Sequence, residues 1–307
     1  MRRLALIAAL PLALFAAPTF AQDAHAGHNA QAVTPAFASD RISVEVVGTG
    51  PDVVLIPGLS SSPEVWRSTI AALPGYRYHL IHVRGFAGLA PGANSTGPVV
   101  SPVADEIARY VRDGGLTRPA LVGHSLGGTL AMMVATRHPD SVGRLMVVDM
   151  FPFIGAMFGG PSATPDSVRP MAEQIRTGIA STSGDAARAQ TEQTIAGMVR
   201  TESMRAAAVE HSLASDPATS GQAMYDIVTT DLTRDLVRFT GPFRVLYAAP
   251  PTMPFSPDML GIFYRTAYSG APQAEVELIP DAYHFIMWDE PARFQRELRE
   301  FLMEPAR

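Results

Sequence analysis

The stretch LVGHSLGGTLAMMVATRHPDSVGRLMVVD, residues 121–149, contains the pattern on which the predicted fold depends. The apolar residues Leu121 and Val122 lead into GHSLG at 123–127, a helical stretch follows at once, and the apolar run 145–148 ends at Asp149. A G-x-S-x-G pattern alone is only suggestive, but a strand before it and a helix after it form the context that it requires. We therefore predict a strained strand-to-helix turn that exposes the Ser125 hydroxyl; a Ser that merely caps a helix is the alternative. On so sharp a turn we expect His124 to point elsewhere and give it no catalytic role.

Short apolar runs alternate with helical stretches through most of the chain after residue 41. The predicted strands are 42–46, 53–56, 78–83, 120–122, 145–148, 243–248 and 276–279. The predicted helices are 64–73, 103–111, 126–138, 258–268 and 291–303. This alternation predicts an α/β fold with a mostly parallel central sheet and helices on both faces. In such sheets the functional residues lie beyond the carboxyl ends of the strands.

One stretch, residues 150–240, interrupts the alternation. It has no good strand signal and contains Ala-rich helical patches at 186–200 and 204–215. It is too long for a connection and too helical for a disordered linker. We predict a helical cap over the carboxyl edge of the sheet, inserted into an α/β core formed by residues 41–149 and 241–307.

The first 21 residues have the pattern of a secretory signal peptide. Met1, Arg2 and Arg3 precede an uncharged apolar run, and TFA at 19–21 offers small residues at the −3 and −1 positions of a cleavage site. The run is short and contains two prolines, which favours cleavage over a membrane anchor. We expect residues 22–40 to form a flexible leader. The mature protein is then periplasmic or secreted, with no stable membrane span.

Composition excludes several kinds of chemistry. The chain has no Cys, which excludes disulfides, thiolate metal sites and a Cys nucleophile. All 24 basic residues are Arg, which excludes Schiff-base chemistry and a phosphate-binding Lys. The net charge of the chain is −5. Removal of the signal peptide takes away Arg2 and Arg3, which leaves 22 basic and 29 acidic residues and a net charge of −7. A negative charge argues against nucleic-acid partners. His25 and His28 have no further candidate ligand nearby, so we expect neither a metal nor another cofactor.

Residues 41–304 resemble the α/β-hydrolase superfamily, in its capped, serine-dependent, esterase-like branch. The most specific pieces are the 121–149 stretch, PGLSSSPEVW at 57–66 and HFIMWDEPARF at 284–294. The resemblance implies that Ser125 is the nucleophile. It implies His284 as the general base, because this His follows the last predicted strand and precedes the final helix. Imidazole suits that role because its pKa lies near neutrality.

The acid that orients the base departs from the family pattern. Most members carry it just after the strand that is here 243–248, but residues 249–254 contain no carboxylate. Some branches carry it where Asp149 stands, and we favour Asp149 because strand ends hold carboxylates more rigidly than loops. Asp258 is the alternative, although a place in the first turn of a helix explains it. Asp281 fits a turn after Pro280.

The resemblance also places the oxyanion hole and bears on the substrate. Backbone N–H groups of Leu59 and Leu126 are the expected donors, with Pro57 in the place of the usual His of the family. A further set of residues could line an apolar pocket above Ser125 or pack the cap against the core: Met150, Phe151, Phe153, Ile154, Met157 and Phe158. Together they favour a hydrophobic acyl or alkyl group over a sugar or nucleotide.

The sequence thus predicts an exported serine hydrolase that cleaves a carboxylic ester of a small, fairly hydrophobic molecule through an acyl-enzyme on Ser125. Hydrolysis of a lactone, thioester, amide or carbon–carbon bond would use the same residues, as would acyl transfer. Ser at position 125, in place of Asp, argues against dehalogenase and epoxide hydrolase chemistry. A non-catalytic ligand-binding protein of the same fold is the second class, favoured only by the missing carboxylate at 249–254.

Overall fold

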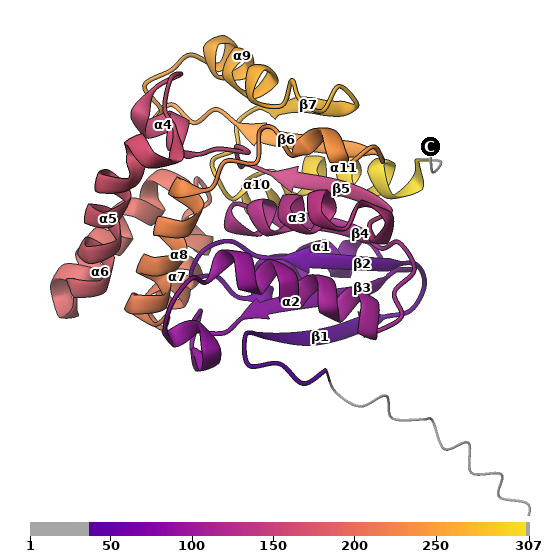
Figure 1. The fold of residues 1–307 in the computed structure, drawn as a ribbon, viewed down its shortest axis with the longest axis horizontal. Helices are drawn as coiled ribbons and strands as arrows, with labels where there is room; N and C mark the ends of the chain where they lie inside the picture. The colour runs from indigo at the N-terminus through magenta and orange to yellow at the C-terminus, as the bar shows by residue number, and fades with distance from the viewer. Residues whose placement is uncertain (1–36, 305–307) are drawn as a thin grey trace, which may run out of the picture. The chain divides into compact units, whose positions relative to one another are not determined.

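The computed structural model describes residues 37–304, so the predicted signal peptide and most of the predicted leader lie outside the described residues. Within them, seven strands form one sheet in the order β1-β3-β2-β4-β5-β6-β7 (Figure 1). The strands are β1 (Ile42–Gly48), β2 (Asp52–Ile56), β3 (Arg77–Val83), β4 (Ala120–His124), β5 (Arg144–Val148), β6 (Phe243–Ala248) and β7 (Ala274–Ile279). Only the pairing of β1 with β3 is antiparallel. The prediction of a mostly parallel sheet is confirmed.

The register of the parallel strands brings their carboxyl ends to one edge of the sheet. Ile56 of β2 pairs with Gly123 of β4, and His124 pairs with Val148 of β5. Val148 in turn pairs with Leu246 of β6. The loops that follow these strands therefore begin side by side, and this brings together residues that are far apart in the sequence.

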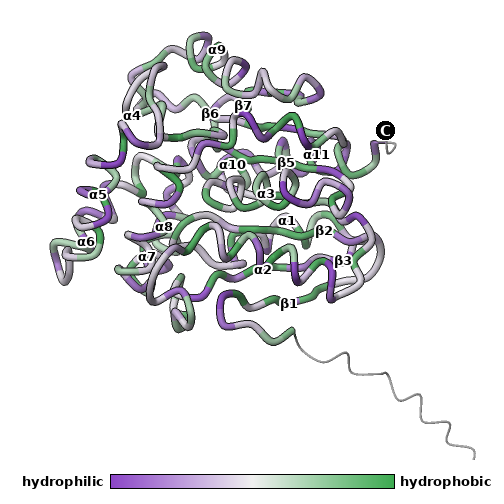
Figure 2. Tube along the Cα trace, in the orientation of Figure 1, coloured by the Kyte–Doolittle hydropathy of each residue, from purple (hydrophilic) through white to green (hydrophobic). Residues whose placement is uncertain are grey.

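Helices cover both faces of the sheet. They are α1 (Arg67–Ala72), α2 (Val100–Asp113), α3 (Leu126–Arg137), α9 (Pro257–Ala267), α10 (Ile286–Asp289) and α11 (Pro291–Met303). Leu121 and Val147 pack in one core with α2, α3 and α9, whereas Val122 and Val148 pack in a second core with α10 and α11. Because successive residues of the central strands face opposite cores, β2, β4, β5 and β6 are apolar almost throughout (Figure 2). None of the helices within residues 37–304 combines the length and the hydropathy needed to cross a membrane.

Five helices lie between β5 and β6, in the region that we call the insertion (residues 150–240). They are α4 (Gly155–Gly159), α5 (Pro165–Ser181), α6 (Gly184–Met198), α7 (Glu202–Leu213) and α8 (Pro217–Thr229). The two predicted Ala-rich patches correspond to α6 and α7. Val168 and Ala172 of α5 and Val228 of α8 form a small core of their own with Phe153. Figure 1 shows α5 to α8 gathered at one end of the sheet. The domain limits at residues 150 and 240 stay a prediction.

Candidate active site

Ser125 lies at a sharp turn between β4 and α3. Its backbone has φ +54° and ψ −123°, a conformation that residues with a side chain rarely adopt. Glycines allow the close contacts of this turn: a Cβ on Gly123 would lie 2.1 Å from the Gly127 carbonyl oxygen, and one on Gly127 would lie 2.2 Å from that of Ile56. The Ser125 N–H donates to the Val148 carbonyl at 2.9 Å, which ties the turn to the neighbouring strand. Steric contact thus explains both glycines of the G-x-S-x-G pattern.

Asp149 follows β5 directly, and its carboxylate contacts His284. Its Oδ2 accepts a hydrogen bond from His284 Nδ1 at 2.7 Å. Its Oδ1 accepts one from the Ala248 N–H and one from the Tyr264 hydroxyl, each at 3.0 Å. The Asp149 backbone has φ +52°, and its N–H donates to the Leu246 carbonyl at 2.7 Å. Both carboxylate oxygens are occupied, which fixes the orientation of the carboxylate and hence of the imidazole.

The other two candidate carboxylates lie elsewhere. Asp258 is exposed in the first turn of α9, where the Ser256 hydroxyl caps the helix by accepting the Met259 N–H at 3.3 Å. Asp281 is exposed at a turn after β7, with φ +62°. Of the three carboxylates that the sequence offered, the structure brings Asp149 into contact with His284.

His284 lies in the loop between β7 and α10, and it lines the same cavity as Ser125. The His124 ring packs beside it, with ring centres 4.6 Å apart, and His124 Nε2–H donates to the His284 carbonyl oxygen at 3.0 Å. Within residues 37–304 no hydrogen bond joins the Ser125 hydroxyl to the His284 ring. Such contacts commonly tighten only when substrate is bound.

Burial sets the charge of the groups around the Asp149–His284 pair. It holds the pKa of fully buried His124 well below its ordinary value, and the nearby His284 lowers it further. His124 is therefore neutral, with its proton on Nε2, while Nδ1 has no partner among the described residues. Burial raises the pKa of Tyr264 well above its ordinary value, and the Asp149 charge adds to this effect. Tyr264 accordingly stays protonated and donates to Asp149.

The predicted oxyanion donors lie on either side of the Ser125 turn. Leu59 follows β2 and lines the cavity, and Leu126 is the first residue of α3. Within residues 37–304 neither N–H donates to an acceptor of the protein. The Leu59 loop packs against the turn at Gly58, where a Cβ would lie 3.1 Å from His124 Nδ1 and 3.2 Å from Ser125 Cβ. Two unpaired N–H groups therefore belong to the two segments that meet at Ser125.

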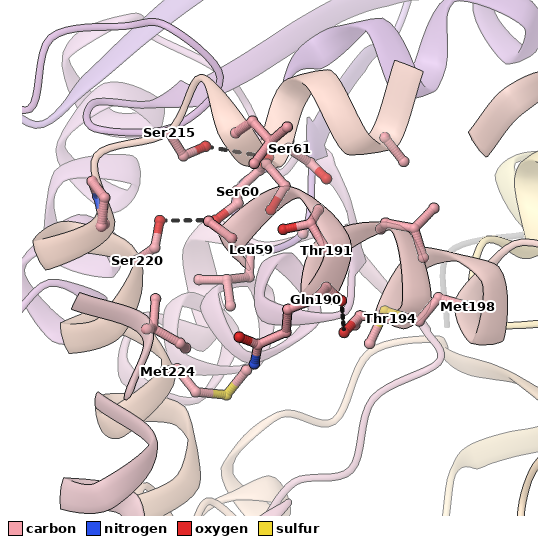
Figure 3. Close-up of a pocket in the computed structure, with 18 of the residues that line it drawn as sticks. Leu59, Ser60, Ser61, Gln190, Thr191, Thr194, Met198, Ser215, Ser220 and Met224 are labelled. Carbon is pink, nitrogen blue, oxygen red and sulfur yellow. Dashed lines mark hydrogen bonds between the residues drawn. The ribbon is translucent and has the colours of Figure 1, made fainter. Parts of the chain in front are cut away.

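A cavity of about 770 Å³ is lined by Ser125, His284 and residues from helices α5 to α8 of the insertion. Figure 3 shows Gln190, Thr191 and Thr194 of α6 and Met224 of α8 among its walls. Apolar lining residues include Ile175, Ile179, Ile195, Met198, Met224 and Ile227, and hydroxyl-bearing ones include Ser60, Ser61, Thr191, Thr194, Ser212 and Ser220. The hydroxyls of Ser60 and Ser220 lie 2.8 Å apart and join the Leu59 loop to α8. The walls are thus partly apolar and partly polar, and the charged residues Asp185 and Arg188 also line the cavity.

The Met and aromatic residues at the start of the insertion do not line this cavity. Met150, Phe151 and Phe153 are buried, and the Phe151 ring stacks on that of Tyr264 with centres 4.0 Å apart. Phe158 is 50% exposed. Of the two alternatives, pocket lining and packing, the structure supports packing for five of the six residues: Met150 and Phe151 belong to one core of the sheet, Ile154 and Met157 pack against it, and Phe153 belongs to the small core of the insertion. The apolar walls of the cavity come mainly from α5 to α8 instead.

Two side chains that hold the site were not predicted from the sequence. Tyr264 is one apolar position of α9, and nothing in the sequence indicates that this helix packs against Asp149. His124 was expected to point away from the site, but its ring is directed at the main chain of His284. The structure gives His124 two supporting contacts, one with the ring and one with the main chain of His284.

Several known hydrolases are similar to this chain. Residues 53–297 match the sequence model of the alpha/beta hydrolase family. The chain is 34% identical over 125 residues to a pimeloyl-[acyl-carrier protein] methyl ester esterase from Aeromonas hydrophila, a match that covers 40% of this chain and 47% of that protein. It therefore spans about half the length of this relative. It is 26% identical over 292 residues to a 2-hydroxy-6-oxononadienedioate/2-hydroxy-6-oxononatrienedioate hydrolase from Pseudomonas sp., a match that covers 88% of this chain and 94% of that protein.

Among solved structures, a bromoperoxidase from Bacillus anthracis superposes with a TM-score of 0.71. The match covers 86% of this chain and 95% of that chain, at 20% sequence identity. At this level of identity the likeness shows the fold alone.

Proposed function

Because the chain belongs to the alpha/beta hydrolase family, we propose that it is a serine hydrolase that cleaves a carboxylic ester through an acyl-enzyme on Ser125. The observation that carries the proposal is the 2.7 Å contact between Asp149 and His284, together with the fact that His284 lines the same cavity as the strained Ser125. The matched relatives, which include an esterase and a hydrolase, support hydrolase activity in general.

In the proposed reaction the substrate carbonyl carbon lies next to the Ser125 hydroxyl. As Ser125 Oγ bonds to this carbon, its proton passes to His284 Nε2, and the carbonyl oxygen becomes an oxyanion. The Leu59 and Leu126 N–H groups donate to the oxyanion. His284 then gives the proton to the leaving alkoxide as the carbon–oxygen bond breaks. Water attacks the remaining acyl-enzyme by the same route and releases the acid and free Ser125.

Asp149 is the proposed orienting acid. Its Oδ2 accepts the Nδ1 proton of His284, so Nε2 presents its lone pair toward Ser125, and the carboxylate stabilises the imidazolium that forms. Its Oδ1 is held by the Ala248 N–H and the Tyr264 hydroxyl, so the carboxylate keeps its orientation as the charge on His284 changes. This arrangement weighs against the alternative of a binding protein without activity.

The cavity supports a substrate with both apolar and polar parts. Isoleucine and methionine side chains suit an alkyl chain, whereas the Ser and Thr hydroxyls and the Gln190 amide suit ether, amide or hydroxyl groups. The same catalytic groups would serve a lactone, a thioester, an amide or a carbon–carbon bond. A panel of esters graded by acyl length, with a matched lactone and amide, separates these substrates by kcat/KM.

The export predicted from residues 1–21 is part of the proposal. Cell fractionation tests it, together with the N-terminal sequence of the mature protein, which we expect to begin at Gln22. Recovery of the full-length chain in the cytoplasm would contradict the export but leave the proposed chemistry in place.

A fluorophosphonate probe tests the chemistry directly. We expect the wild-type protein to be labelled at Ser125, the S125A variant not to be labelled, and the H284A variant to react far more slowly, because the hydroxyl lacks its base. Mass spectrometry of the labelled peptide identifies the modified residue. A folded wild-type protein that binds esters but is not labelled would contradict the proposal and support the binding protein.

A further inference from the structure

Asp289, the last residue of α10, is a carboxylate that is only 5% exposed and has no cationic side chain paired with its oxygens within residues 37–304. Its oxygens accept three backbone N–H groups instead. Oδ2 accepts those of Tyr283 at 2.9 Å and Arg200 at 3.1 Å, and Oδ1 accepts that of Thr201 at 2.8 Å. Tyr283 directly precedes His284, whereas Arg200 and Thr201 form the turn between α6 and α7. One carboxylate therefore joins the loop of the proposed base to the insertion.

Further contacts join the same two segments. The Phe285 N–H, on the other side of His284, donates to the carbonyl oxygen of Met198 at 3.2 Å. The Arg200 side chain donates to the Asp289 carbonyl oxygen at 2.8 Å and to a Glu290 carboxylate oxygen at 2.6 Å. Phe285 is thus bound directly to the segment that ends α6, and Tyr283 is bound to it through Asp289. Met198 also lines the cavity, so this link continues into a cavity wall.

A buried carboxylate is stable only when donors satisfy its oxygens, and a buried N–H without an acceptor is costly in the same way. The three donors come from two segments that are more than eighty residues apart in the sequence. The carboxylate and the three N–H groups must all be satisfied together. The His284 loop and the α6–α7 turn therefore have one favourable arrangement relative to each other. A substitution that removes the carboxylate leaves three N–H groups without this partner.

We propose that Asp289 is a positioning residue that fixes the main chain before His284 to the α6–α7 turn, so that the base and one wall of the cavity are held as a unit. The inference rests on the proposed role of His284 as the general base. Asp289 acts through the backbone and does not touch the reacting atoms. A shift of the imidazole by about 1 Å can reduce a rate by about 10²-fold, so we expect the effect in kcat more than in KM.

The chain offers a matched control in Asp226, a buried carboxylate of α8 that is 9% exposed. Its Oδ2 accepts the N–H groups of Val99 and Val100, at the start of α2, at 2.7 and 3.0 Å. Its Oδ1 accepts the Gln222 side-chain amide at 2.8 Å. Asp226 therefore also joins the insertion to the core through backbone N–H groups, but it contacts no residue of the His284 loop.

The test compares the D289A and D226A variants of the full chain with a chromogenic ester. We expect D289A to lower kcat by about 10²-fold with KM within about twofold of wild type, and the phosphonate labelling of Ser125 to slow in proportion. We expect D226A to keep kcat within about threefold, because the partners of Asp226 do not belong to the His284 loop. Urea unfolding of both variants ensures that the rates are compared for folded protein. Equal losses of kcat in the two folded variants would overturn the inference.

A spectroscopic signal separates positioning from general loss of stability. The His284 Nδ1 proton shared with Asp149 should give a far-downfield proton resonance, which we expect to be lost or broadened in D289A and retained in D226A. Retention of an unchanged resonance in D289A would overturn the inference.

D289N serves if D289A does not fold. Its single carbonyl oxygen can accept the Tyr283 and Arg200 N–H groups while the Thr201 bond is lost, so we expect kcat to fall by about tenfold, against about threefold or less for D226N. Equal kcat values for these two variants would overturn the inference. Failure of the proposed function is distinguishable, because the wild-type protein would then not be labelled at Ser125. If the present inference fails, Ser125 of the wild-type protein is still labelled, and Ser125 of D289A or D289N is labelled at the same rate as in wild type.

Discussion

The carboxyl edge of the sheet and the insertion meet at one cavity, but they are built differently. Helix α3, which starts at the Ser125 turn, buries eleven of its twelve residues. Helix α6, which forms a wall of the cavity, buries only Ile195 among its fifteen residues. The edge is thus fixed on all sides by packing, whereas α6 is held over the cavity by far fewer contacts.

This difference predicts different consequences of substitution. At the sheet edge, strand register and close glycine contacts determine where each reacting group lies, so a change there should alter the chemistry by orders of magnitude. On α6, by contrast, the side chains that line the cavity belong to a mostly exposed helix, so a change there should alter the choice of substrate by small factors. Paired substitutions test this contrast: one of the pair changes the sheet edge, and the other changes a comparable residue elsewhere in the chain.

The largest expected effect distinguishes Asp149 from Asp258 as the acid that orients His284. Asp149→Asn should lower kcat by about 10⁴-fold, because an amide in place of the carboxylate stabilises the wrong tautomer of His284. Asp258→Asn should leave kcat within about twofold, because Asp258 is exposed in the first turn of α9. Steady-state kinetics with one chromogenic ester measures both. The reverse result would remove Asp149 from the site.

The next effect contrasts two glycines. Gly127→Ala should lower the free energy of unfolding by about 3 kcal/mol or more, because its Cβ would lie 2.2 Å from the Ile56 carbonyl oxygen. Gly178→Ala in α5 should raise it by about 0.5–1 kcal/mol, because an added Cβ meets no atom within 4 Å and Ala favours a helix. Urea unfolding at neutral pH measures both changes. Equal destabilisation by the two variants would show that the insertion is packed as tightly as the edge.

The same contrast explains what the sequence could predict. Residues at the edge belong to short local patterns: an apolar run, a turn with obligatory glycines and a helix. Such patterns gave the seven strands and the strand–turn–helix at Ser125. The contact between Asp149 and His284 could also be predicted from the sequence, because both residues follow predicted strands of one parallel sheet.

The cavity walls could not be predicted in this way. The segment 150–158 is rich in Met and Phe, which suits a pocket and a packed interface equally well, and most of these residues pack in a core of the sheet or in the small core of the insertion. The residues that do line the cavity come from four helices whose mutual arrangement depends on tertiary contacts. The roles of Asp289 and Tyr264 could not be predicted for the same reason, because each residue contacts a segment that is distant in the sequence.

A pH titration extends the contrast to stability. His124 is neutral in the folded protein because burial and His284 lower its pKa, whereas the unfolded chain should titrate near pH 6.5. Below that pH the unfolded state binds a proton that the folded state does not, so stability falls as the pH falls, by about 1.4 kcal/mol per unit. His124→Gln keeps a donor for the His284 carbonyl and removes this titration. We expect it to reduce the loss of stability as the pH falls from about 6.5 to about 5.

His211 of α7 is the matched residue in the insertion. Burial also lowers its pKa, but it is less buried than His124, so His211→Gln should reduce the acid loss of stability by less. Urea unfolding at pH 5 and pH 7 measures both variants. An equal or larger effect of His211→Gln would contradict the distinction between a fixed edge and a more open insertion.

The smallest expected effect concerns Met224, whose flexible side chain forms part of the apolar wall on α8. Met224→Ala removes contact with the distal part of a long acyl chain and leaves the reacting groups in place. We expect kcat/KM for esters of six or more acyl carbons to fall by about three- to tenfold, because loss of one or two methylene contacts is worth about 1 kcal/mol. Acetyl esters should be unaffected, because we expect a short acyl group not to reach Met224. Profiles of kcat/KM against acyl length for wild type and variant measure this difference, and an equal loss for acetyl esters would mean that Met224 supports the catalytic groups themselves.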